Sequence, residues 1–205
     1  MNPHHSFPKF CNFTDKASIN LSFHLHLNTE LITNEEIYQK VILQMVPATK
    51  RFLWIGTADI KDLYVDKGKK MVPFLEMLSE LLRKNVEIRL VYAKEPGPAF
   101  RKDFDKYPNL VHGLEQMHCP RVHFKTIISD GTRAFTGSAN LTGAGMGAKS
   151  KNNRNFEAGI ITSDPTFIDK LMNQFDALWM GLNCKPCGRK QYCTEWQQFE
   201  IKGTK

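Results

Sequence analysis

The sequence has no long apolar run. Nowhere does it approach the roughly 20 consecutive apolar residues that a membrane-spanning helix needs, although 41% of its 205 residues are hydrophobic. The first nine residues also lack the continuous apolar stretch of a secretory signal. We therefore expect no transmembrane segment and a cytoplasmic location. The length suits one domain with a substantial core.

Internal repeats and long low-complexity segments are also absent, and the acidic residues do not cluster at the ends of predicted strands. A two-metal nuclease site needs such clustered carboxylates, so we do not expect one. Basic residues are in excess: 28 Lys and Arg against 21 Asp and Glu give a formal charge of +7. This excess favours a polyanionic partner, nucleic acid ahead of an anionic membrane surface. A basic protein that is merely kept soluble by its charge would have the same composition.

Apolar periodicity predicts strands that alternate with helices. The expected fold is a layered α/β/α sandwich with a central mixed β-sheet, since two of the strands form a hairpin. Capping-box spacing from Thr33 to Glu36 opens the first helix, and Asp164 followed by Pro165 opens the last. The predicted helices end near Val46, Lys84 and Met180, and the second begins at Met71. The predicted strands are Ile19–Leu27, Arg51–Thr57, Val86–Tyr92, Val122–Ser129, Arg133–Gly137 and Phe156–Thr162.

The same pattern divides the chain into three parts. Residues 1–30 form an N-terminal extension with a strand, and residues 31–181 form the catalytic domain. Within that domain, residues 94–120 are rich in proline and charge, which indicates an excursion with one short helix. Residues 182–205 are polar and contain cysteine, so we expect a tail that packs on the domain rather than a second core.

Polar side chains that suit phosphodiester chemistry gather near the predicted hairpin. His123 and Lys125 are two residues apart on a strand and so point to the same face. This places an imidazole nucleophile beside an ammonium that can bind phosphate. Ser138 and Asn140 end the next strand, and Glu157 begins the one after it, where a carboxylate could orient the histidine ring.

These residues resemble the signature of the phospholipase D superfamily, and the likeness covers most of residues 30–181. The matching segments are His123-x-Lys125-x4-Asp130 and Gly137-Ser138-Ala139-Asn140-Leu141-Thr142. The resemblance implies that His123 attacks phosphorus and forms a covalent phosphohistidine, without a metal cofactor for catalysis. It further implies that Lys125 and Asn140 bind the phosphate and that Ser138 assists.

Two further residues take their roles only from this resemblance. Glu157 is similar to the acidic residue that holds the histidine, and Asp130 to the partner that supports the structure of the site and sets the pKa of the histidine. Simpler interpretations stay open, because an Asp before Gly131 is a common turn residue and Ser138 could serve only its own turn. His123 and Lys125 alone would also fit a buried histidine beside a lysine on the surface.

Many members of this superfamily carry two such motifs, and the second histidine protonates the leaving group. This chain has one motif, and its other histidines lack a lysine at the required offset. A complete site therefore requires a second chain, and we expect a homodimer with one shared site on a two-fold axis. Single-motif chains of this size resemble bacterial endonucleases of the superfamily.

Four of the five cysteines have a regular spacing. Cys184-x2-Cys187-x5-Cys193 lies in the tail, and Cys119 lies just upstream of His123. Four thiolates would complete a structural Zn²⁺ site or hold a [4Fe-4S] cluster. The spacing resembles the iron–sulfur staple of some nucleases of another fold. Free thiols remain the alternative, and Cys11 is interpreted as unpaired.

A glycine-rich segment follows the second motif. Residues 143–150 superficially resemble a phosphate-binding loop, but Ala148 separates Gly147 from Lys149, where that motif needs Gly and Lys to be adjacent. We interpret the segment as a basic loop at the rim of the site, with Lys149, Lys151 and Arg154 placed to contact a nucleic-acid backbone. A plain solvated loop fits equally well.

Three functions compete. The leading hypothesis is an endonuclease that cleaves DNA, or RNA, through phosphohistidine. The second is a phospholipase or phosphatidyl transferase with the same chemistry, which would need an apolar interfacial surface that the sequence does not indicate. The third is a non-catalytic nucleic-acid-binding module, against which the intact set of site residues argues.

Overall fold

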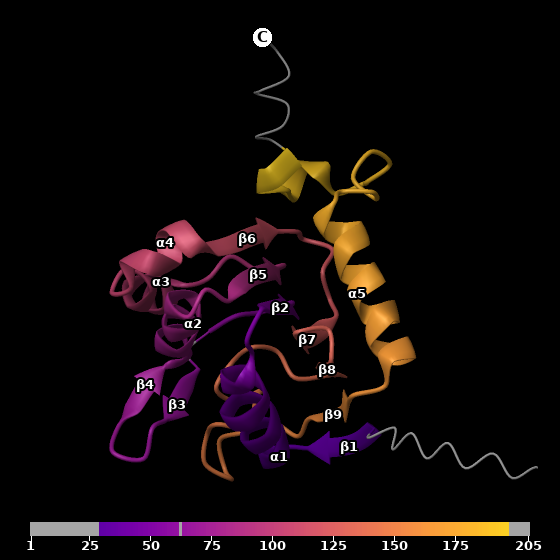
Figure 1. Ribbon diagram of the computed structural model, residues 1–205. Helices are drawn as coiled ribbons and strands as arrows, with labels where there is room; N and C mark the ends of the chain where they lie inside the picture. The colour runs from indigo at the N-terminus through magenta and orange to yellow at the C-terminus, as the bar shows by residue number, and fades with distance from the viewer. Residues whose placement is uncertain (1–28, 62, 197–205) are drawn as a thin grey trace, which may run out of the picture.

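The computed structural model describes residues 29–61 and 63–196 (Figure 1). The predicted strand Ile19–Leu27 lies outside these residues. Seven strands form one sheet in the order β1-β9-β8-β7-β2-β5-β6. They are β1 (Thr29–Thr33), β2 (Phe52–Thr57), β5 (Glu87–Tyr92), β6 (Leu114–His118), β7 (Lys125–Ser129), β8 (Arg133–Gly137) and β9 (Ala158–Thr162). The strands β2, β5 and β6 pair in parallel and the other pairs are antiparallel, so the sheet is mixed, as predicted.

Helices cover both faces of this sheet. The short α1 (Glu35–Ile37) continues as a π-helix over Tyr38–Met45 and a 3-10 turn over Val46–Ala48. The other helices are α2 (Phe74–Arg83), α3 (Pro98–Phe104), α4 (Pro108–Gly113) and α5 (Pro165–Trp179). A small two-stranded sheet joins β3 (Tyr64–Asp66) to β4 (Met71–Pro73), and a 3-10 turn covers Lys190–Tyr192.

Alternation along the strands creates two cores. In β2, Leu53 and Ile55 face the larger core, whereas Trp54 faces the smaller one. The larger core takes in the α1 segment and α2, and the smaller core takes in Ile168 and Phe175 of α5. Figure 1 shows α5 alone on one side of the sheet, with α1 and α2 on the other. The predicted α/β/α sandwich is therefore confirmed.

Several element boundaries differ from those predicted. The second helix starts at Phe74 rather than Met71, because Met71–Pro73 pairs with β3 and Pro73 caps the helix. Residues 94–120 form two short helices and a strand, β6, which pairs with β5. The sheet also includes Thr29 and Glu30 in β1, two residues that the predicted division had assigned to the extension.

The last helix begins and ends where its sequence indicates. The Asp164 carboxylate accepts hydrogen bonds from the backbone N–H groups of Thr166 and Phe167 at 2.8 and 3.3 Å. At the other end, Gly181 has a φ of +68° and the N–H of Leu182 donates to the carbonyl of Ala177, which is a Schellman motif. Among residues 29–61 and 63–196, no helix has the length and apolar character required to cross a membrane.

Candidate active site

The strand register brings together one end of each of the four adjacent strands β2, β7, β8 and β9. Lys125 at the start of β7 pairs with Gly137 at the end of β8, which pairs with Gly159 at the start of β9. On the other side of β7, Thr126 pairs with Gly56 near the end of β2. Residues that are far apart in the sequence therefore meet at these strand ends, where α/β proteins commonly place ligand-binding residues.

His123 and Lys125 lie side by side, as the sequence predicts, although β7 begins only at Lys125. The Lys125 ammonium lies 3.3 and 3.4 Å from the two ring nitrogens of His123 and donates to the His123 carbonyl at 2.8 Å. The imidazole itself is exposed, whereas only 7% of Lys125 is exposed. An exposed imidazole thus lies next to a buried cation.

The buried ammonium of Lys125 has no acidic partner. Within the described residues, no carboxylate lies within 4.0 Å of its Nζ atom. A buried charge without a counter-ion is costly. Such a cation is therefore suited to bind an anion that arrives from solvent next to His123.

Ser138 and Glu157 are joined to each other. The Ser138 hydroxyl donates to the Glu157 carboxylate through a short hydrogen bond and accepts from the backbone N–H of Ala158 at 3.2 Å. The Asn155 side-chain amide donates to the other Glu157 oxygen at 3.0 Å. In the described part of the chain Glu157 makes no hydrogen bond to His123. No direct contact therefore supports its predicted role in orienting the ring.

Asn140 is held through its amide oxygen. That oxygen accepts from the backbone N–H of Asp59 at 3.1 Å, and the Thr57 hydroxyl lies 3.5 Å away. The same hydroxyl accepts from the N–H of Leu141 at 3.0 Å and donates to the Asp59 carbonyl at 2.8 Å. Because the oxygen is engaged, the amide nitrogen of Asn140 is left to donate to a ligand.

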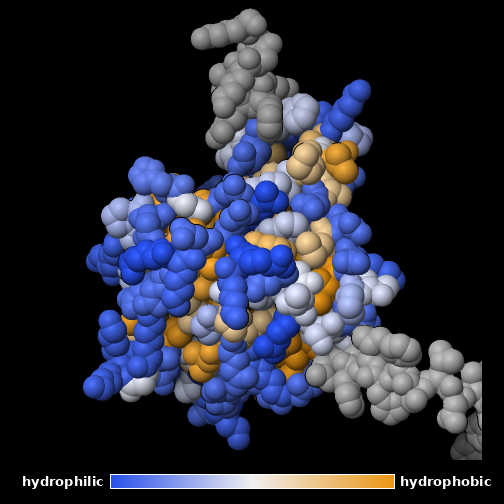
Figure 2. Space-filling model, viewed as in Figure 1, coloured by the Kyte–Doolittle hydropathy of each residue, from blue (hydrophilic) through white to orange (hydrophobic). Residues whose placement is uncertain are grey.

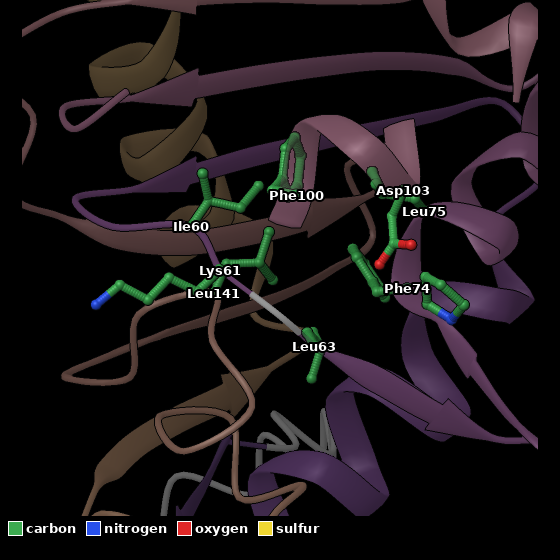
Figure 3. Close-up of a pocket in the computed structure, with 9 residues that line it drawn as sticks. Ile60, Lys61, Leu63, Phe74, Leu75, Phe100, Asp103 and Leu141 are labelled. Atoms are coloured by element: carbon green, nitrogen blue, oxygen red, sulfur yellow. The ribbon is translucent and has the colours of Figure 1, made fainter. Parts of the chain in front are cut away.

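The loop that carries Asn140 is anchored on apolar side chains. Leu141 and Ile60 form a parallel bridge between their backbones. Figure 3 shows their side chains beside Phe100 at a small cavity, with Lys61 extending away from it. The cavity measures about 20 Å³, enough for no more than about one water molecule. The apolar contacts around the cavity hold the loop, and the cavity is too small to be a substrate site.

Asp130 lies at the opposite end of β7, apart from the other predicted residues. The four steps from Lys125 to Ser129 alone span about 13 Å. The Asp130 carboxylate accepts from the backbone N–H groups of Lys50, Arg51 and Phe52 at 2.7–3.3 Å. Asp130 and Gly131 both have positive φ, +56° and +68°, as the tight turn of the hairpin requires. The structure does not bring Asp130 to His123, and its contacts secure the start of β2.

The three basic residues of the glycine-rich loop differ in their surroundings. Lys149 and Lys151 are exposed. Arg154 instead donates to the Glu35 carboxylate at 2.7 Å, and only 17% of its side chain is exposed. Arg154 therefore ties the loop to α1.

The four spaced cysteines line one cavity of about 530 Å³ beyond the end of α5. Burial raises the pKa of the Cys119 thiol, and the neighbouring Cys193 and Cys187 thiols raise it further. Burial also raises the pKa of Cys184, whereas the backbone N–H of Arg189 lowers the pKa of Cys187. In residues 29–61 and 63–196, no three His, Cys, Asp or Glu side chains already stand where they could hold a metal ion.

Two residues of the site escaped the sequence interpretation. Thr57 positions the Asn140 loop, and the Asn34 side chain accepts from the backbone N–H of Glu157 at 3.0 Å. The position of Thr57 at the end of a buried parallel strand was an available signal. No sequence signal marked Asn34, because its contact with Glu157 depends on the pairing of β1 with β9.

Comparison with known proteins agrees with this fold. A family model described as "Cardiolipin synthase, PLD-like domain" matches residues 42–179, more than half of the chain. The chain belongs to the phospholipase D superfamily. No curated protein matches the sequence.

Solved structures share the fold at low sequence identity. Nuc from Salmonella typhimurium, a phospholipase D family member, has a TM-score of 0.54 and 16% identity over 75% of this chain and 94% of its own. NucT from Helicobacter pylori has a TM-score of 0.55 and 13% identity over 75% and 96%. TrmBL2, an archaeal chromatin protein with a novel mode of DNA binding, has a TM-score of 0.51 and 13% identity over 74% of this chain and 52% of its own.

Proposed function

We propose that this protein is a phosphodiesterase that cleaves nucleic acid, DNA ahead of RNA, through a covalent phosphohistidine on His123. The observation that carries this proposal is the buried ammonium of Lys125, which lies against an exposed imidazole and has no acidic partner among the described residues. A phosphate bound there would receive the charge of Lys125 and present phosphorus to the ring of His123.

In the first step a ring nitrogen of His123 attacks phosphorus. The P–N bond forms as the P–O bond to the leaving group breaks, and the leaving oxygen takes a proton from an acid on the opposite side. Lys125 and the amide nitrogen of Asn140 stabilise the charge on the non-bridging oxygens. The step requires no divalent ion, because these groups supply the positive charge and the donor.

In the second step water attacks phosphorus and the P–N bond breaks, which returns the free imidazole. The base for this water is the group that acted as acid in the first step. We assign that role to His123 of a second copy of the chain, in a homodimer with one shared site. Phe156, which is 97% exposed and directly precedes Glu157, is an aromatic residue of the type that is enriched at protein interfaces, and a partner chain would cover it.

Nucleic acid is the favoured substrate because of charge. The formal charge of +7 favours a polyanion. The exposed Lys149 and Lys151 follow Asn140 on the loop that also carries Arg154, where they would contact a phosphate backbone. The similarity in fold to a chromatin protein that binds DNA is consistent with this choice.

A phospholipid is the second candidate substrate, because the matching family model is described by a cardiolipin synthase. Apolar side chains reach the surface where α5 meets the tail, among them Met180 and Leu182, which are 70% and 72% exposed (Figure 2). The same two displacements would then transfer a phosphatidyl group, with an alcohol in place of water.

The test uses a panel of substrates in excess EDTA. Full-length protein is incubated with labelled single- and double-stranded DNA, RNA, and phosphatidylglycerol vesicles. His123→Ala tests the nucleophile, and His112→Ala serves as its control, because His112 is an exposed histidine on α4, outside the site.

We expect nucleic acid to be cleaved by the wild type and by His112→Ala, and not by His123→Ala. Activity that EDTA abolishes, or that survives in His123→Ala, would contradict the mechanism. Turnover of the vesicles without cleavage of nucleic acid would contradict the choice of substrate and leave the mechanism standing.

A further inference from the structure

The tail after α5 has almost no apolar core of its own. From Gly181 to Trp196 every side chain is exposed or half-buried. Its regular structure consists of the 3-10 turn over Lys190–Tyr192 and a single helical turn over residues 194–196. Burial of apolar surface therefore contributes little to its position. Segments of this kind are usually held by a disulfide or a metal.

The tail nevertheless packs against the segment that leads to His123. The His118 ring bonds to the Thr194 hydroxyl at 3.0 Å, and the His118 backbone N–H donates to Glu195 at 3.5 Å. The Cys193 thiol points at the His118 carbonyl at 3.8 Å. These contacts place Cys119, the residue after His118, at the cavity that the tail cysteines line.

We propose that Cys119, Cys184, Cys187 and Cys193 together bind a thiophilic metal centre that fixes the tail to the catalytic domain. The four side chains come from two segments more than 60 residues apart in sequence and line the same cavity. None of them is in a disulfide. Four thiolates are the ligand set of a tetrahedral zinc site or of an iron–sulfur cluster.

The sulfurs need to close in before they could ligate a metal, since no three of them stand at ligating separation. Rotation about the Cα–Cβ bonds moves a sulfur without moving the backbone, and the cavity of about 530 Å³ leaves room for it. The metal would then act on the site indirectly. Val122 donates its N–H to the Cys119 carbonyl at 3.0 Å, and His123 follows directly.

The inference is independent of the proposed function, because its test reads metal content and tail order rather than cleavage. Full-length protein is prepared anaerobically, and its zinc, iron and acid-labile sulfide are measured with its visible spectrum. Cys184→Ser and Cys187→Ser are compared with Cys11→Ser, a matched change at the fifth cysteine.

For wild type and Cys11→Ser we expect either about one zinc per chain with no visible band, or about four iron and four sulfide with a broad visible band. Cys184→Ser and Cys187→Ser should lose the metal. A wild type that holds no stoichiometric metal even after zinc is added would overturn the proposal, as would disulfides among the four cysteines or loss of metal in Cys11→Ser.

Limited trypsin digestion covers the case in which the serine variants fail to fold. Lys185, Arg189 and Lys190 offer cleavage sites between the cysteines. Removal of the metal from wild type by a chelator should speed cleavage at these sites, and zinc or cluster reconstitution should restore protection. Equal cleavage before and after chelation would show that no metal holds the tail.

Discussion

The two polar atoms of the Asn140 side chain have different surroundings. Its oxygen accepts from the backbone N–H of Asp59, which leaves its nitrogen to donate to a ligand. Lys125 donates to the His123 carbonyl, and no carboxylate among the described residues balances its charge. At the scale of single residues, these contacts support the proposal that the site binds an anion.

Replacing Asn140 by Asp separates these two roles. An Asp oxygen can still accept from Asp59, so the fold should be retained. The donor to phosphate is lost and a negative charge replaces it, so we expect kcat/KM to fall by about 100-fold or more. Steady-state kinetics and thermal unfolding measure the two effects. Near wild-type activity in this variant would contradict the donor role.

Asp130 should behave in the opposite way. Its carboxylate serves three backbone N–H groups at the start of β2, far from His123. We expect Asp130→Ala to lower the free energy of unfolding by about 1–3 kcal/mol, with kcat of the folded protein unchanged. Asp130→Asn, which keeps an acceptor oxygen and tolerates positive φ, should lose less. A large fall in kcat with an unchanged free energy of unfolding would instead place Asp130 in the active site.

At the scale of elements, close contact between β2 and the segment before β7 sets the position of His123. A Cβ atom on Gly56 would lie 2.1 Å from the ring of Phe124, which stands between His123 and Lys125 in sequence. Only glycine leaves room for that ring. Through Phe124, the packing of β2 therefore affects the position of His123 and Lys125.

Gly56→Ala should consequently impair both folding and catalysis. Because Phe124 must move, we expect a loss of about 1–3 kcal/mol in stability and a fall in kcat. Gly97→Ala is the control, since a Cβ at Gly97 meets no atom within 4 Å. Chemical denaturation and kinetics of both variants check this. Unchanged kcat in Gly56→Ala would show that the position of Phe124 does not matter.

The sequence predicted the mixed α/β fold because strong local signals marked its central elements. The apolar run of β2, the Asp130-Gly131 turn and the Asp164 cap each depend on neighbours in sequence. The excursion over residues 94–120 was predicted poorly, since β6 is a polar edge strand defined by its pairing with β5. The contacts of Glu157 with Ser138 and Asn34 join residues that are far apart in the sequence, so no local pattern indicated them.

At the scale of the whole molecule, the account requires two chains for one site. The described chain supplies one His123 and one Lys125, and the acid for the leaving group comes from the partner chain in the proposal. Assembly and catalysis should therefore be coupled. A monomer would bind phosphate but lack the acid of the first step.

Mixing subunits tests this coupling. Wild type and His123→Ala are combined in equal amounts, unfolded and refolded together, so that chains pair at random. If both copies of His123 are needed, about one quarter of the dimers are active, and activity should fall to that fraction of an equal amount of refolded wild type. A fall to only about one half would mean that each chain acts alone.

The central claim is that His123 carries the phosphoryl group, and trapping the intermediate tests it most directly. Full-length protein reacts briefly with a labelled oligonucleotide in excess EDTA, is denatured in alkali, and is mapped by mass spectrometry. We predict an alkali-stable, acid-labile adduct on His123, present in wild type and absent in His123→Ala. Cleavage without any adduct, or an adduct on another residue, would contradict the account.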